Sequence, residues 1–132
     1  MQVQKVKDII VLHLTGEDLN SPFETTKVVE QLLQEDGERK FVADLTHVPD
    51  LVSMQAGTLF TIHALCYENV AILKLSGASE KVKLILRLLG LDKIIEIHHG
   101  EKVALASFGP YEGIPPVTEG TPLKRSVEKG QT

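Results

Sequence analysis

The strongest constraint on the fold is an alternation of short apolar runs with segments of helical periodicity. Residues 9–14, 40–45, 70–75 and 94–97 are apolar runs of strand length, and helical patterns separate them. Continuous apolar runs of this length are typical of strands that are covered on both faces. A chain of 132 residues can bury one core of this kind. The order predicts one α/β domain with a four- to five-stranded mixed sheet and about four helices.

The N-terminal residues 3–14 predict either two early strands or one bent hairpin, with Lys7 and Asp8 at the bend. Residues 16–22 (GEDLNSP) have the composition of a turn. The Ser-Pro pair that closes this turn is typical of a helix N-cap followed by the first helical position. We therefore expect a helix to begin there and to end at an Asp-Gly pair near residue 36.

Two further helices are expected on either side of the strand at residues 70–75. The first covers residues 54–67 and is apolar on most sides. The second begins after Ser79, which we expect to cap its N-terminus, and stops at Gly90. A closing helix is expected over residues 101–107. The residues of the second helix that we expect to face inward are Val82, Ile85, Leu86 and Leu89.

The composition changes after Phe108. Residues 109–132 contain four prolines and four glycines, and they show no apolar periodicity. Such a segment buries too little apolar surface to offset the entropy of ordering it. We predict a domain over residues 1–108 and a flexible tail over residues 109–132.

Composition excludes several classes of protein. The formal net charge is −4 without a long basic run, which gives no support for nucleic-acid binding. No apolar run reaches the roughly 18 residues that a membrane-spanning helix needs, and the N-terminal residues do not resemble a secretory signal. The single cysteine, Cys66, cannot form an intrachain disulfide and suits a reducing compartment. These features predict a cytoplasmic protein that does not insert into membranes.

The histidines do not have the spacing of a metal site. His98 and His99 are adjacent and would point to opposite faces of a strand, and no H-x-x-x-H pattern occurs. We therefore expect no metal and no cofactor, and structural or solvated roles for the histidines. The five are His13, His47, His63, His98 and His99.

No catalytic constellation stands out in the sequence. Ser53, His47 and Asp44 are the residue types of a hydrolase triad, but the G-x-S-x-G elbow is absent. A G-x-x-x-x-G-K-[ST] loop for nucleotide phosphates is absent as well. Cys66 lies within an apolar helical pattern and is expected to be a core thiol. We predict that the protein is not an enzyme.

Four stretches resemble a known family when they are taken together in order. They are LTGEDL (14–19), VADLTHV (42–48), SGASEKVKLILRLLGLDKIIEI (76–97) and GEKVALASF (100–108). In this series the chain resembles the STAS domain, the fold of bacterial anti-sigma factor antagonists. The resemblance covers nearly all of residues 1–108 and does not extend to the tail.

The resemblance implies a regulatory loop after the strand at residues 40–45. Typical members carry Asp-Ser-Ser/Thr-Gly-Leu-Gly there, and the first hydroxyl residue accepts a phosphate. In this chain the motif falls on Val52, Ser53, Met54, Gln55 and, at its second glycine, Gly57, so that Ser53 and Gly57 match it. An alternative alignment moves Asp50 to the acidic position and Leu51 to the acceptor position. We prefer Ser53, for which a plain helix cap is the alternative role.

The implied function is partner switching. A family member of this kind binds an ATP-dependent serine kinase of the GHKL type that is also an anti-sigma factor, and a PP2C-type phosphatase reverses the phosphorylation. A second reading is a STAS scaffold subunit that is not phosphorylated, within a transporter-associated or stressosome-like complex. The residues expected to bind a partner are Gly16, Glu17, Asp50, Leu51, Val52, Ser53, Met54, Gln55 and Gly57.

Overall fold

A computed structural model of the chain describes residues 1–109, which form a five-stranded mixed sheet and five α-helices. The strands are β1 (Gln2–Val6), β2 (Ile9–Thr15), β3 (Lys40–His47), β4 (Ile72–Ser76) and β5 (Glu96–His98). The helices are α1 (Gly16–Leu19), α2 (Pro22–Gln34), α3 (Ser53–Glu68), α4 (Glu80–Leu88) and α5 (Glu101–Ala106), with a 3₁₀ turn over Leu91–Lys93. The predicted fold class is confirmed.

The strands lie in the order β1-β2-β3-β4-β5, the same order as in the chain. β1 and β2 form an antiparallel hairpin, and every other neighbouring pair is parallel. The hairpin turns at Lys7, whose φ of 59° is in the left-handed region. The N-terminal segment therefore forms two early strands, as one interpretation predicted, and they pair as the hairpin of the other. The parallel pairing places the carboxyl ends of β2, β3 and β4 at one edge of the sheet.

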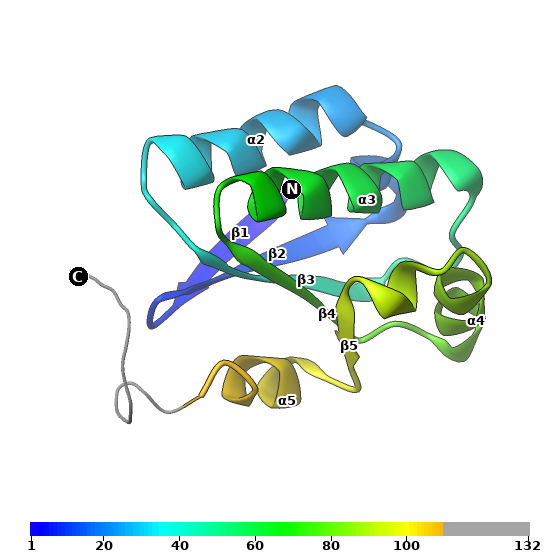
Figure 1. Ribbon diagram of the computed structural model, residues 1–132. Helices are drawn as coiled ribbons and strands as arrows, with labels where there is room; N and C mark the ends of the chain where they lie inside the picture. Colours follow the sequence, from blue (N-terminus) through cyan, green and yellow to red (C-terminus); the bar gives the residue numbers. More distant parts are fainter. Residues whose placement is uncertain (110–132) are drawn as a thin grey trace.

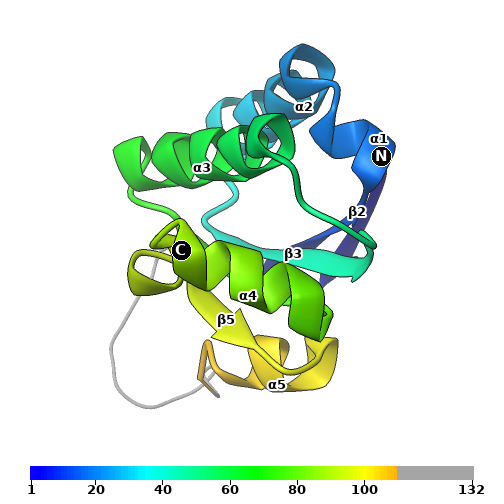
Figure 2. The same cartoon turned by 90° about the vertical axis from the view of Figure 1, so that its right-hand side faces the viewer.

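The helices are divided between the two faces of the sheet. α2, α3 and α4 lie over one face, and α5 lies against the other (Figures 1 and 2). The larger core is formed between the first face and its helices, with Phe41, Leu59 and Leu86 among its fully buried side chains. A smaller core lies under α5 and includes Val11, Val42 and Ala104. Both faces of the central strands are thus covered, which agrees with the buried parallel strand predicted at residues 40–45.

Several local predictions are confirmed. Pro22 is the first residue of α2, and Ser79 caps α4 by accepting a hydrogen bond from the Val82 amide at 3.2 Å. Gly90 follows α4 with a φ of 76°, which is typical of the glycine that ends a helix. Ser21 occupies the N-cap position of α2, but its hydroxyl makes no capping hydrogen bond.

Three local predictions were wrong. The segment expected as a turn contains the one-turn helix α1, because Thr15 and Asp18 form a capping box that closes it. Val70, expected in a strand, lies in a turn with a φ of 56° and a side chain that is 87% exposed. Leu89, expected in the core, is the C-terminal cap residue of α4 and is 53% exposed.

The C-terminal part of the chain is described only as far as Gly109, so the predicted flexible tail lies almost entirely outside the described residues. Between residues 1 and 109, no helix is both long enough and apolar enough to cross a membrane. The described residues include all of the predicted domain at 1–108.

Candidate functional site

The loop between β3 and α3 places Ser53 at the tip of a long helix. Ser53 is the first residue of α3, and the N-cap position before it is occupied by Val52. The Ser53 side chain is exposed, and its hydroxyl has no hydrogen-bond partner among residues 1–109. The alternative in which Ser53 merely caps the helix is therefore wrong. Its hydroxyl is open to solvent beside the unpaired N–H groups of the first helical turn.

Gln55 provides the cap that Ser53 does not. Its side-chain oxygen accepts a hydrogen bond from the Val52 amide at 2.9 Å, and its side-chain nitrogen donates to the carbonyl of Gly16 at 3.2 Å. Gln55 is itself buried, so this bridge is protected from solvent. The bridge brings Gly16 and Glu17 of α1 beside the tip of α3. Two segments that are 39 residues apart in the chain thereby form one surface.

A second hydrogen bond holds α1 and α3 together. The buried Thr58 hydroxyl donates to the carbonyl of Leu19 at 2.7 Å. Because α1 is only one turn long, it depends on such contacts for its position. The expected partner-binding residues on α1 and α3 are consequently held in a fixed arrangement.

Asp50 and Leu51 shape the loop before the helix. Leu51 is buried in the larger core, so the alignment that places it at a phosphate-accepting position is disfavoured. The Asp50 carboxylate accepts a hydrogen bond from the Leu51 amide at 2.8 Å and lies 3.2 Å from the Lys81 ammonium group. These two interactions, the backbone hydrogen bond first, lower the pKa of Asp50 below its ordinary value. Asp50 thus links the loop to the start of α4.

The residues on either side of Ser53 are apolar and open to solvent. Val52 is 53% exposed and Met54 is 59% exposed. We call the exposed residues Glu17, Val52, Ser53, Met54 and Gly57 the α3 tip surface. An exposed apolar patch with a polar rim is typical of a protein-binding surface.

Gly57 is the glycine of the α3 tip surface, and the described residues around it do not require a glycine at this position. A Cβ atom at this position would meet no atom within 4 Å. We expect Gly57→Ala to raise the free energy of unfolding by about 0.5–1 kcal/mol, because glycine inside a helix is destabilising relative to alanine. Urea denaturation of the two proteins measures the difference, and a loss of stability would contradict this account of Gly57.

The residues considered for catalysis do not assemble. The carboxylate of Asp44 lies 2.8 Å from the Nδ1 atom of His13 and accepts hydrogen bonds from Thr46, whereas the exposed His47 forms no hydrogen bond or ion pair with it. Cys66 is fully buried, and burial raises the pKa of its thiol to about 12. A thiol of this kind is not reactive at neutral pH, and the prediction of a core thiol is confirmed.

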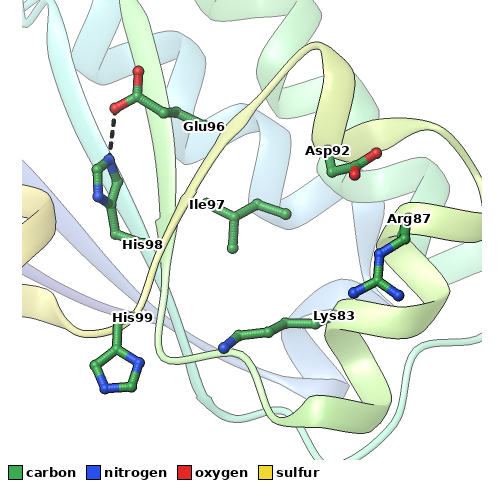
Figure 3. A pocket seen from close by; sticks show the side chains of 7 residues that line it. All are labelled: Lys83, Arg87, Asp92, Glu96, Ile97, His98 and His99. Carbon is green, nitrogen blue, oxygen red and sulfur yellow. Dashed lines mark hydrogen bonds and ion pairs between the residues drawn. The ribbon is translucent and has the colours of Figure 1, made fainter.

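A shallow pocket of about 500 Å³ lies between α4 and β5 (Figure 3). Lys83 and Arg87 reach into it from α4, on the side opposite Ile97. Two carboxylates, those of Asp92 and Glu96, line it as well, and Glu96 is hydrogen-bonded to His98 at 2.6 Å. Positive and negative groups are therefore mixed in this pocket, and it does not select ligands of one charge.

The sequence analysis missed one cluster of metal-ligating side chains. His13 of β2 lies near the carboxylates of Asp44 of β3 and Glu101 of α5. The spacing of the histidines along the chain does not reveal this cluster, because its three residues are distant in the sequence. The signal that would have revealed the cluster is the parallel register of β2 and β3, which pairs His13 with Asp44.

Comparison with protein families gives one match. The model of the STAS domain matches residues 1–104, which is most of the described part of the chain. A comparison with curated proteins gave no match.

Solved structures of similar fold come from three settings. A structure of the stressosome, a signal integration and transduction hub, matches with a TM-score of 0.71 and 19% identity over 80% of this chain and 94% of its own. The unphosphorylated anti-sigma factor antagonist SpoIIAA matches with a TM-score of 0.68 and 14% identity, over 81% of this chain and 94% of SpoIIAA. A sulfate transporter family protein from Wolinella succinogenes matches with a TM-score of 0.62 and 21% identity over 78% and 88%.

Proposed function

The chain belongs to the STAS domain family, and from this premise we propose that it is an anti-sigma factor antagonist that binds its partner through the α3 tip surface. The partner is an anti-sigma factor that is also a serine kinase of the GHKL type. Phosphorylation of Ser53 releases the partner, and a PP2C-type phosphatase restores the binding form. The protein acts in the cytoplasm as a binding module and a kinase substrate, and it is not itself an enzyme.

The exposure of Ser53 is the observation that carries this proposal. A kinase must reach the hydroxyl, and the Ser53 side chain is exposed without a hydrogen-bond partner among the described residues. The exposed apolar side chains of Val52 and Met54 on either side supply area for a protein contact. Contact surface and phosphate acceptor thus coincide, which is what a switch by modification requires.

The position of Ser53 also explains how a phosphate is accommodated without refolding. The first turn of α3 offers unpaired N–H groups and the positive end of the helix dipole. A phosphate group brings about −1.5 to −2 charges, which this helix end stabilises. In the complex the same charge would lose its water against an apolar contact, and that loss opposes binding. The domain keeps its structure while the complex loses stability.

The test is affinity capture from lysate of the source organism with three forms of the full chain. Wild type and Leu88→Asp are expected to retain a GHKL-type kinase, which mass spectrometry identifies, and Met54→Asp is expected to lose it. Leu88 is a matched control because it is an exposed apolar residue of α4 outside the α3 tip surface. Retention of the kinase by Met54→Asp would contradict the proposed binding surface.

A second candidate is a scaffold subunit that is never phosphorylated, in a stressosome-like or transporter-associated complex. The apolar character of Val52 and Met54, where the family motif is polar, favours this reading, since it suits permanent contact. The likeness in fold to a stressosome component and to a transporter-family domain agrees with it. In the same capture experiment this candidate predicts other STAS proteins, or a permease with its ATPase, in place of a kinase.

A further inference from the structure

A row of polar side chains crosses the sheet on the face that carries α5. The strand pairing aligns His13 of β2 with Asp44 of β3, and Asp44 with Ser76 of β4. Residues paired in this way project to the same face of a sheet. Ile9 and Val11 lie four and two residues before His13 in β2, on the same face of the strand. They pack in the smaller core with α5. The row therefore lies beside α5, which begins at Glu101.

Three of the side chains in this region converge. His13, Asp44 and Glu101 each place one ligand atom within 4.8 Å of the other two. Ligand atoms around a single tetrahedral zinc ion are about 3.3–3.5 Å apart, since each lies about 2.0–2.2 Å from the metal. Side-chain rotations that shorten these separations by up to about 1.5 Å would thus bring the three atoms into a coordination shell. Asp44 is buried and the other two residues are half-buried, so that solvent reaches the cluster only in part.

The cluster contains more negative charge than its protein partners balance. The Asp44 carboxylate accepts hydrogen bonds from the amide and the hydroxyl of Thr46 and lies 2.8 Å from the Nδ1 atom of His13. Glu101 lies within 4.8 Å of it and has neither a hydrogen bond nor an ion pair from residues 1–109. Two carboxylates this close repel each other unless a cation lies between them. His13 is the single basic side chain of the cluster.

The hydrogen bonds of His13 prepare its Nδ1 atom to bind a metal. The Nε2 atom lies 2.9 Å from the Oε1 atom of Gln4, to which it donates its proton in the assigned orientation of the amide. Nδ1 then faces the Asp44 carboxylate at 2.8 Å. This 2.8 Å contact is a hydrogen bond, and a metal ion bound at Nδ1 would take the place of its proton. Metal-ligating histidines characteristically donate their other N–H to a carbonyl or carboxylate oxygen in this way.

Ser76 supplies an independent indication of a missing ligand. Its side chain is 0% exposed, and its hydroxyl is the buried side-chain atom of residues 1–109 that has no hydrogen-bond partner. A buried hydroxyl without a partner costs about 1–3 kcal/mol. Because Ser76 is paired with Asp44, its hydroxyl projects into the same row. A metal ion in the cluster, or a water molecule bound to that ion, would give it a partner.

We propose that His13, Asp44 and Glu101 form a binding site for a divalent transition-metal ion, with the Ser76 hydroxyl beside it. One imidazole nitrogen and two carboxylate oxygens are a ligand set that suits Zn²⁺ and, more weakly, Mn²⁺. Mg²⁺ binds nitrogen ligands poorly and is not expected to compete. The ion ties the start of α5 to β2 and β3, and it acts independently of partner binding at the α3 tip surface.

The test is calorimetric titration of Zn²⁺ into the full chain after metal has been removed with EDTA. We expect one ion per chain, and at least tenfold weaker affinity in Glu101→Gln and in His13→Asn. Glu80→Gln and His63→Asn are matched controls, since they make the same changes on α4 and α3, and they are expected to leave the affinity within twofold. Nitrogen-15 NMR spectra of the histidine rings should show the largest change on zinc addition at His13.

Either of two results would overturn the proposal. The first is the absence of saturable zinc binding by the wild-type chain. The second is binding that Glu101→Gln retains unchanged, with the NMR changes at other histidines, because the zinc would then lie elsewhere. Glu101 has no described side-chain partner, so its substitution does not by itself disturb the fold.

Discussion

Glutamate at position 53 is expected to weaken binding of the captured partner more than a hundredfold, while the domain remains folded. Ser53→Glu places a negative charge between the exposed side chains of Val52 and Met54, where the partner has to displace water. A penalty of about 3 kcal/mol is sufficient for this effect, since about 1.4 kcal/mol corresponds to a factor of ten. Titration calorimetry with the purified partner measures the change in Kd, and circular dichroism monitors the fold.

Thr61→Glu is the matched control for this substitution. Thr61 is an exposed hydroxyl residue on the same helix, two turns beyond Ser53 and outside the α3 tip surface. It receives the same change of charge and is expected to change the Kd less than threefold. Equal binding by wild type and Ser53→Glu would reject Ser53 as the switch and favour the constitutive scaffold. Ser53→Ala should keep binding and lose phosphorylation by the kinase.

Alanine at position 77 is expected to destabilise the domain by about 3 kcal/mol or more, because two independent penalties add. Gly77 has a φ of 72°, which costs an L residue about 1–2 kcal/mol. In addition, a Cβ atom there would collide with the Thr46 hydroxyl and lie 3.0 Å from the Asp44 carboxylate. Thr46 cannot move away freely, since it donates hydrogen bonds to Asp44 from its amide and its hydroxyl.

Gly90→Ala separates the two penalties. Gly90 has a similar φ of 76°, but a Cβ atom there would meet nothing within 4 Å. Gly90→Ala should lower the free energy of unfolding only by the backbone penalty, about 1–2 kcal/mol. Urea denaturation of both variants gives the two free energies of unfolding. Equal losses would show that the contact with Thr46 costs nothing and would contradict the packing described around the end of β3.

Local sequence chemistry predicted much of the fold correctly. Apolar runs of strand length indicated buried strands, and their alternation with helical periodicity indicated the α/β sheet. Ser79 and Gly90 marked the ends of α4 because capping geometry depends on residues that are neighbours in the chain. These features depend on short-range sterics and hydrogen bonding. Capping chemistry did not place Ser53, which is the first residue of α3 and not its cap; the family resemblance indicated its position.

The wrong predictions occurred where a local pattern was too short or ambiguous. α1 has 4 residues, which is too short a stretch for helical periodicity to be recognised. Val70 continued an apolar run, yet the chain turns there to direct Ile72 into the sheet next to β3. Leu89 matched the apolar stripe of α4 but is the C-cap residue after Leu88, where the helix ends beyond the edge of the core.

The sequence by itself determined the five strands and the longer helices and, for most of them, which side is apolar. Only the tertiary structure decided which distant residues meet: Gln55 with Gly16 at the α3 tip surface, and His13 with Asp44 and Glu101 under the sheet. The physical reason is that periodicity fixes the face of a side chain within its own element. Its neighbours in other elements follow from strand order and register, which the packing of the whole core selects.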